Sequence, residues 1–220
     1  MAWKYLKRNT QKEAMNYKHI LSISTILIIL SPLEILAQPI LEYKNAIEKC
    51  HVDTFETIAQ GRKIKLIKFD LTCLEGAQLP DFIATTVNGK KIGKEYFLGN
   101  VSVINFWFKG CTPCVNEIPK LNRVVKKFKD MDVNFLAINL QDSKAEIIKF
   151  LNTSPFYFDQ IADGGIIIHN SFFYNGSYPA TFVIDQNLRI IKAFNGWSPD
   201  ESIKNNIDKI LIPLIKRALL

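Results

Sequence analysis

The sequence predicts an α/β domain with a mixed central sheet and helices on both faces. Two long apolar runs, Val101 to Phe108 and Val133 to Asn139, are typical of strands that are buried on both faces. Between them lies a segment whose apolar residues recur at helical spacing. Strands that alternate with helices in this way indicate a layered α/β fold.

The segments around these two runs carry turn and helix signals. Phe82 to Thr86 and Lys90 to Ile92 are predicted to pair as a hairpin across Asn88-Gly89, which is a strong turn signal. The helix after the first buried run contains Pro119, which is expected to kink it. The apolar stripe of this helix consists of Ile118, Leu121, Val125 and Phe128.

Three further elements complete the predicted order. Ser143 to Glu146 forms a capping box that opens a helix through Leu151. Thr181 to Ile184 and Leu188 to Ala193 form a second hairpin. Ser198 to Glu201 combines an N-cap, a proline at the first helical position and an acidic residue, so it should open a final helix. The residues that this helix is expected to bury are Ile203, Ile207, Ile210, Leu211 and Leu214.

Composition excludes several classes of protein. The chain has 220 residues, of which 48% are hydrophobic and 22% are charged, so it is neither disordered, collagen-like nor a polytopic membrane protein. The net charge is +7. Basic residues cluster at Lys126 to Lys129 and alternate from Arg62 to Lys68, which favours solvated faces over a nucleic-acid site. We therefore expect no nucleic-acid partner.

The first 37 residues have the pattern of a signal peptide. Basic residues precede an apolar run from Ile20 to Leu30, and Ala37 offers a small residue at a cleavage site. The run is shorter than the about 20 residues of a spanning helix, although an uncleaved membrane anchor at residues 20–37 is the alternative. We expect an exported protein of the periplasm or cell envelope, with an N-terminal extension at 38–75 and a main domain at 76–220.

Cys111-Thr112-Pro113-Cys114 lies where the first buried strand meets the kinked helix. This C-x-x-C could be half of a zinc site, but zinc needs four ligands and no second C-x-x-C is present. The redox interpretation fits the context better. The N–H groups and the dipole at a helix N-terminus stabilise a thiolate. We expect a redox-active Cys111–Cys114 disulfide, no metal and no other cofactor.

At these residues the chain resembles the thioredoxin superfamily, and within it the exported TlpA/ResA-like thiol-disulfide oxidoreductases. Asn105 to Pro119 and Ser177 to Asp185 carry the likeness, together with the lead-in Gly76 to Phe82 and the turn Asn88 to Lys90. The resemblance covers about residues 76–220. It implies a thioredoxin-like fold with the redox pair, a helix proline and a proline before a strand in the family's order.

The resemblance also implies roles for single residues. Cys111 would be the exposed nucleophile that forms a mixed disulfide, and Cys114 would be buried and would resolve it. Pro179 would be cis, which would place the Tyr178 backbone beside the pair to hold a substrate segment. On the sequence alone, an ordinary trans turn proline is the alternative. The other residues expected to contact a substrate are Gly110, Thr112 and Pro113.

Two residues directly before the pair, Lys109 and Gly110, bear on its surroundings. The family often has Trp where this chain has Gly110, so the surface beside Cys111 is expected to be flatter. Lys109 is close enough in sequence to lower the pKa of the Cys111 thiol, although an ordinary exposed lysine is the alternative.

Glu117 follows Cys114 by three residues, so both project from one helix face. Thioredoxin itself has a buried Asp at the strand position where this chain has Asn105, and an Asn side chain cannot take up a proton. ResA-like proteins instead place a Glu at the position of Glu117. A half-buried carboxylate here would have a raised pKa and could accept a proton from Cys114. An exposed first-turn Glu that only favours the helix dipole is the alternative.

Cys50 and Cys73 lie in the extension, outside the resemblance. In an oxidising compartment they are expected to form a structural disulfide. Two unpaired buried cysteines, or a relay with Cys111 and Cys114, are the alternatives.

These observations predict an exported thiol-disulfide oxidoreductase that reduces protein disulfides, and the family's tasks include reducing the haem-attachment cysteines of apocytochromes. A membrane electron donor would re-reduce the enzyme, which we expect to be monomeric. A disulfide oxidase or isomerase is the first alternative. A peroxidase would need a P-x-x-x-[ST]-x-x-C motif, which the residues before Cys111 do not form. A copper- or haem-handling chaperone is a further alternative, but no His or Met lies near the cysteine pair in the sequence to support it.

Overall fold

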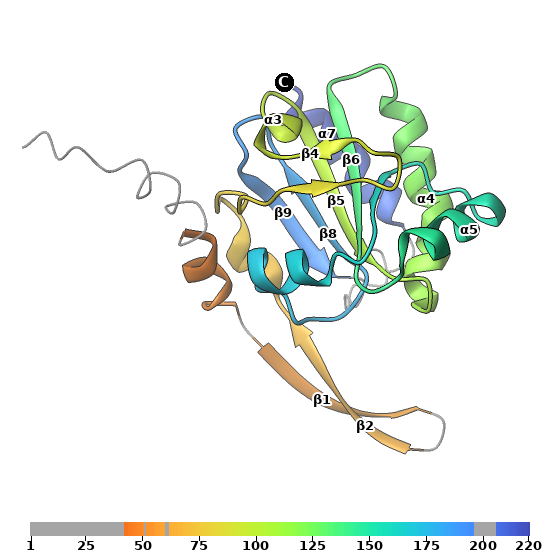
Figure 1. Ribbon diagram of the computed structural model, residues 1–220. Helices are drawn as coiled ribbons and strands as arrows, with labels where there is room; N and C mark the ends of the chain where they lie inside the picture. Colours follow the sequence, from red (N-terminus) through yellow and green to blue (C-terminus); the bar gives the residue numbers. More distant parts are fainter. Residues whose placement is uncertain (1–41, 51, 60–61, 196–205) are drawn as a thin grey trace, which may run out of the picture. The chain divides into compact units, whose positions relative to one another are not determined.

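The computed structural model describes residues 42–50, 52–59, 62–195 and 206–220. Its central sheet has five strands in the order β7-β6-β5-β8-β9 (Figure 1). Strands β7, β6 and β5 are parallel, whereas β8 and β9 pair antiparallel, which confirms the predicted mixed sheet. The strands are β5 (Val101–Trp107), β6 (Val133–Asn139), β7 (Asp159–Ile161), β8 (Ala180–Ile184) and β9 (Ile190–Asn195).

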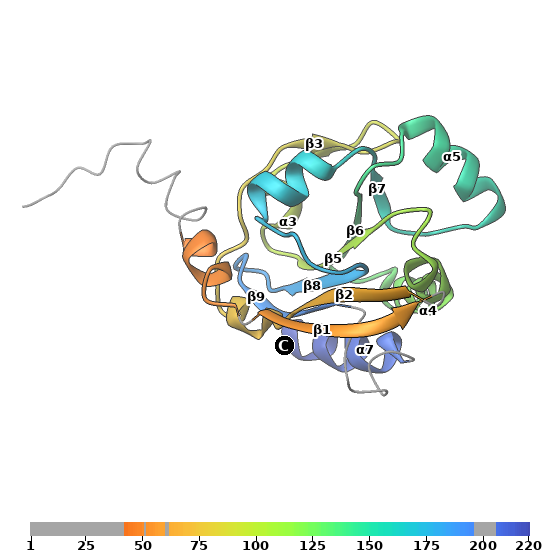
Figure 2. The ribbon, with the colours of Figure 1, turned by 90° about the horizontal axis from the view of Figure 1, so that it is seen from below.

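Helices cover both faces of this sheet, as predicted. The long helices α4 (Thr112–Phe128) and α7 (Ile207–Ala218) lie on one face, and the short helix η2 (Ile167–Ser171) lies on the other (Figure 2). Helix α5 (Lys144–Thr153) follows β6, and it begins with the predicted capping box between Ser143 and Glu146. The one-turn helix α3 (Lys94–Phe97) precedes β5.

Two hydrophobic clusters fill the two faces. Ile104 and Phe106 of β5 belong to the cluster that contains Ile168 of η2, whereas Val103 and Trp107 belong to the cluster that contains α4 and α7. Successive side chains of a strand point to opposite faces. Asn105 of β5 therefore faces α4, the helix that begins at the cysteine pair.

The helix stripes follow the prediction with shifts. Helix α4 buries Val124 and leaves Val125 only partly buried. Helix α7 buries one residue per turn, and Ile210 and Leu214, predicted to be buried, are only partly covered because they flank this line. The buried residues of α7 are Ile207, Leu211 and Ile215. Ser198 to Glu201 and Ile203 lie outside the described residues.

The predicted first hairpin is present but short, with β3 (Ala84–Thr85) and β4 (Lys91–Ile92) joined through Gly89 at φ 87°. Only glycine adopts this left-handed conformation without strain.

The N-terminal extension forms a separate hairpin, β1 (Val52–Ala59) with β2 (Arg62–Phe69), followed by the short helix η1 (Leu71–Leu74). A disulfide joins Cys50 to Cys73, with Cα atoms 5.2 Å apart, and thus closes the base of this hairpin. Tyr43 and Ile47 share a hydrophobic cluster with Leu71 and Leu74 and with residues of the central sheet. Part of the extension is therefore core, although the boundary at residue 76 stays a prediction.

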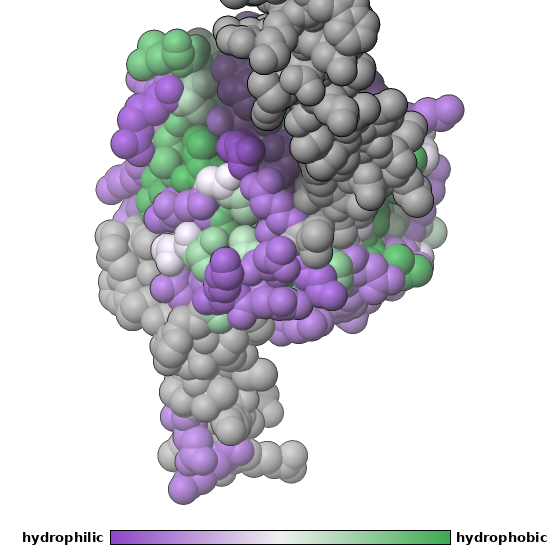
Figure 3. Space-filling model, turned by 90° about the vertical axis from the view of Figure 1, so that its left-hand side faces the viewer, coloured by the Kyte–Doolittle hydropathy of each residue, from purple (hydrophilic) through white to green (hydrophobic). Residues whose placement is uncertain are grey.

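Hydrophilic side chains form a band across the middle of the face in Figure 3, and a hydrophobic patch lies toward its upper left. Among the described residues, no helix is both long and apolar enough to cross a membrane. The predicted leader lies outside the described residues.

Candidate active site

The cysteine pair occupies the first turn of α4. Strand β5 ends at Trp107, a short turn follows, and Cys111 is the N-cap of α4. Cys111 and Cys114 form a disulfide with Cα atoms 5.3 Å apart, and the Cys111 sulfur accepts a hydrogen bond from the Cys114 backbone N–H at 3.3 Å. In the dithiol form the same N–H would face a Cys111 thiolate, which the helix N-terminus also favours.

The two cysteine residues differ less in exposure than predicted. Cys111 is 6% exposed and Cys114 is 1% exposed, so the expectation of an exposed Cys111 is wrong for this oxidised state. The physical reason is that the Cys111 sulfur is bonded to Cys114 and lies against the first turn of α4. The order of accessibility agrees with the predicted roles, and the neighbours Gly110, Thr112 and Pro113 are exposed.

The loop before β8 lies beside the turn that precedes Cys111. The Tyr178–Pro179 peptide bond is cis, as the resemblance implies, and Pro179 is buried. The Tyr178 ring packs edge-on against the Phe108 ring, with centroids 5.6 Å apart. Burial raises the pKa of Tyr178 to about 12, so this phenol is neutral at physiological pH. The structure therefore brings together the segments predicted to form the site.

Glu117 is held from the sheet below it. The Asn105 side-chain N–H group donates to Glu117 Oε1 at 2.9 Å. Burial raises the pKa of Glu117 from 4.5 to about 7, and the hydrogen bond from Asn105 and the charge of Lys120 oppose this rise. The carboxyl can therefore gain or lose a proton near neutral pH, which favours the predicted role over that of an exposed first-turn glutamate.

Lys109 does not point its charge at the cysteine pair. Its ammonium lies 3.0 Å from Glu146 Oε1 and 4.0 Å from Asp142 Oδ1, and its backbone N–H donates to Asp142 Oδ2 at 2.6 Å. The Ser143 backbone N–H and Lys109 lower the pKa of Glu146 to about 2, so this partner is ionised at neutral pH. Two carboxylates thus neutralise Lys109, and the idea that it lowers the pKa of Cys111 finds no support in this geometry.

Four polar residues beneath and beside the site did not stand out in the sequence. Trp107 Nε1 donates to Gln160 Oε1 at 3.1 Å, and Asn139 donates to Asp142 at 2.9 Å. Thr181 lies opposite Asn105 in the β5–β8 register and accepts a hydrogen bond from it at 3.1 Å. The signal for Thr181 was its place at the start of a buried strand. Its contact with Asn105 could not be predicted without knowing that these two strands pair, because the two residues are 76 positions apart in the sequence.

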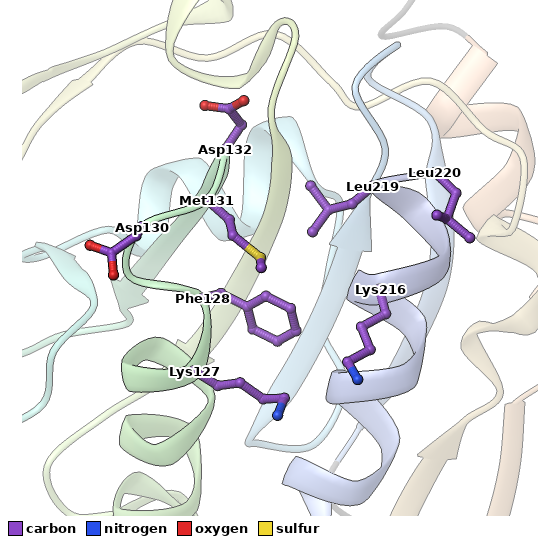
Figure 4. A pocket seen from close by; sticks show the side chains of 8 residues that line it. All are labelled: Lys127, Phe128, Asp130, Met131, Asp132, Lys216, Leu219 and Leu220. Carbon is purple, nitrogen blue, oxygen red and sulfur yellow. The ribbon is translucent and has the colours of Figure 1, made fainter.

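Two cavities lie beside α4. The larger, of about 840 Å³, lies at the C-terminal end of α4, and Figure 4 shows Phe128, Met131 and Leu219 around it. That end is about 24 Å from the cysteine pair, because a helix rises 1.5 Å per residue. The smaller, of about 340 Å³, begins at Val115, directly after Cys114. Among the described residues, no cluster of three or more His, Cys, Asp or Glu could hold a metal ion.

Comparison with known proteins agrees with this geometry. The model of the AhpC/TSA family matches residues 76–193, which is more than half of the chain. The chain belongs to the AhpC/TSA family. The matched region contains β3 to β8, both cysteines of the redox pair, Glu117 and Pro179. The predicted superfamily is therefore confirmed.

Curated relatives carry a redox name. The thiol-disulfide oxidoreductase ResA of Bacillus thuringiensis subsp. konkukian is 28% identical over 155 residues, which are 70% of this chain and 86% of that protein. The protein of the same name from Geobacillus kaustophilus is 29% identical over 136 residues, which are 61% of this chain and 77% of that protein. The predicted enzyme class agrees with these names.

Solved structures confirm the thioredoxin-like fold. A thioredoxin-family thiol:disulfide interchange protein from Chlorobium tepidum TLS superposes with a TM-score of 0.53 at 23% identity, covering 66% of this chain and 97% of that one. A thiol:disulfide interchange protein from Bacteroides sp. gives 0.53 at 19% identity, covering 64% and 90%.

We expect Glu117→Gln to stabilise the oxidised protein at pH 8 by about 3 kcal/mol and to leave its stability at pH 4 nearly unchanged. The pKa of Glu117 is about 7 in the folded protein and 4.5 in the unfolded chain, so the folded state binds the proton more tightly. Its contribution is fully present below pH 4.5 and is lost as the pH rises to 7. Gln mimics the protonated form at every pH. Urea unfolding of both proteins across this range measures the difference, and a gap independent of pH would contradict the prediction.

Proposed function

We propose that this thiol-disulfide oxidoreductase is an exported reductase of protein disulfides that acts through Cys111 and Cys114. One observation carries the proposal. The cysteine pair caps the N-terminus of α4, and a carboxyl with a pKa of about 7, Glu117, lies on the same helix one turn further on. This arrangement offers a stabilised thiolate, a covered second thiol and a proton acceptor.

The first step forms a mixed disulfide. In the reduced enzyme the Cys111 thiolate attacks one sulfur of a substrate disulfide, and a bond forms between that sulfur and Cys111. The substrate bond breaks, and its other sulfur leaves as a thiolate that takes a proton from water. The helix N-terminus favours the Cys111 thiolate that this step needs.

The second step releases the substrate. The Cys114 thiol passes its proton to the Glu117 carboxylate, and the resulting thiolate attacks the Cys111 sulfur. The mixed disulfide breaks, and the second substrate sulfur leaves as a thiolate. The substrate has gained two electrons, and the enzyme is left with the Cys111–Cys114 disulfide. Glu117 then returns its proton to solvent.

Direction and location rest on the sequence. The Thr112-Pro113 dipeptide places a proline beside the second cysteine, as in thioredoxin-like reductases, and the leader pattern of residues 1–37 supports export to the periplasm or cell envelope. An enzyme there needs a membrane electron donor to re-reduce the pair. Protein disulfides, including those of apocytochrome haem-attachment cysteines, are the substrates that we propose.

A single-turnover assay tests this function. The pre-reduced protein is mixed with insulin, and the appearance of insulin thiols and of the Cys111–Cys114 disulfide is followed by alkylation and mass spectrometry. We expect one insulin disulfide to be reduced for each enzyme pair oxidised, and Cys111→Ser to abolish the reaction. An enzyme that oxidises with hydrogen peroxide but not with insulin would overturn the proposal in favour of a peroxidase.

A further inference from the structure

A buried polar pair lies under Glu117. Asn105 and Thr181 are each 1% exposed, and they sit opposite each other on β5 and β8. Both belong to the strand positions that face α4, because Val103 of β5 and Val183 of β8 are in the cluster with that helix. Asn105 Nδ2 is 2.9 Å from Glu117 Oε1 and 3.1 Å from Thr181 Oγ1.

The geometry uses both hydrogens of one amide nitrogen. A carboxamide NH₂ group has two N–H donors and no acceptor. One donor goes to Glu117 Oε1 and the other to Thr181 Oγ1. The opposite orientation of the amide would place its oxygen against the Glu117 carboxylate, which is repulsive when Glu117 is ionised. While the amide keeps this orientation, Glu117 Oε1 is an acceptor in both protonation states, and a proton on the carboxyl resides on Oε2.

We propose that Asn105 and Thr181 are positioning residues that fix Glu117 Oε1 as an acceptor and so direct the proton exchanged with Cys114 to Oε2. The inference rests on the proposed function for its role in exchange. The balance of the step is unchanged: the S–H bond of Cys114 breaks, an O–H bond forms at Oε2, and the electron pair stays on the Cys114 sulfur. Thr181 acts through Asn105, because its hydroxyl accepts a hydrogen bond from the Asn105 amide and so holds that amide in the orientation that donates to Glu117.

Few other charges reach Glu117. Among the described residues, the charge of Lys120 on the same helix acts on it and favours the ionised carboxylate. The groups that contact it from the sheet, Asn105 and through it Thr181, are neutral. Cys111 and Cys114 do not titrate in the oxidised protein. The oxidised state therefore isolates the effect of the Asn105 hydrogen bond on the Glu117 titration.

The test is the titration of Glu117 in the oxidised full chain, followed by NMR of ¹³C-carboxyl-labelled glutamate and assigned with Glu117→Gln. Asn105→Leu has a similar side-chain size but cannot donate, so the midpoint should rise by about one pH unit. Thr181→Val should shift it less and in the same direction. Ser102→Ala is the matched control, since Ser102 is a buried hydroxyl on the same strand that makes no such contact. An unchanged midpoint in Thr181→Val and Asn105→Leu would overturn the inference.

One further variant and one further measurement keep the test decisive. Where Asn105→Leu does not fold, Asn105→Asp places a second carboxyl against Glu117, and the two should share a proton and titrate in two separated steps. The pH profile of insulin reduction should shift by the same amount as the NMR midpoint. A midpoint that shifts while the profile stays fixed would overturn the role in exchange. A wild-type protein that reduces no insulin would instead contradict the proposed function and leave the hydrogen-bond effect standing.

Discussion

Cys114→Ser should form a stable mixed disulfide with a protein substrate and lose turnover by at least about 1,000-fold. Cys111 can still attack, because it remains at the N-terminus of α4. Release fails because the sulfur that is bonded to Cys111 in the oxidised protein is gone. Non-reducing electrophoresis after mixing the reduced variant with insulin measures the trapped complex.

Cys111→Ser is the matched control for this trap. It keeps Cys114, which is 1% exposed, and should form no complex at the same protein concentration. A Cys50→Ser/Cys73→Ser variant should react like the wild type. A complex that forms through Cys114 and not through Cys111 would reverse the roles that we assign.

Removing the Cys50–Cys73 disulfide should lower the free energy of unfolding by about 3 kcal/mol. The bridge spans 23 residues, and it joins the segment that contains Tyr43 and Ile47 to η1. Without it, the unfolded chain gains the freedom of that loop, whereas the folded chain keeps its contacts. Urea unfolding of Cys50→Ser/Cys73→Ser measures the change.

The same variant should keep the exchange activity of the Cys111–Cys114 pair. All four cysteines of the chain are bridged in two separate pairs. Equal unfolding free energies for the variant and the wild type would contradict a structural role for the Cys50–Cys73 bridge. A loss of insulin reduction in a folded variant would favour the relay alternative.

The sequence predicted the elements whose pattern is long and local. Strands β5 and β6 are nearly continuous apolar runs, and the capping box marks the start of α5 within four residues. The short elements carried no such pattern. Strand β7 has three residues and η2 has five, too few for a period to appear.

The site shows the same division between local and distant information. Glu117 could be assigned because its spacing from Cys114 places both on one helix face. The environment of Lys109 could not, since its partners Asp142 and Glu146 come from beyond the next strand. The Asn105–Thr181 pair also depends on strand register, which a sequence pattern alone does not fix.

The reduction potential of the Cys111–Cys114 pair tests the account most directly. The purified protein is equilibrated in dithiothreitol and glutathione buffers, and the Cys50→Ser/Cys73→Ser variant is measured alongside so that the signal belongs to one pair. The account predicts a value near or below that of thioredoxin, about −270 mV. A value near that of DsbA, about −120 mV, would contradict it and indicate an oxidase or isomerase.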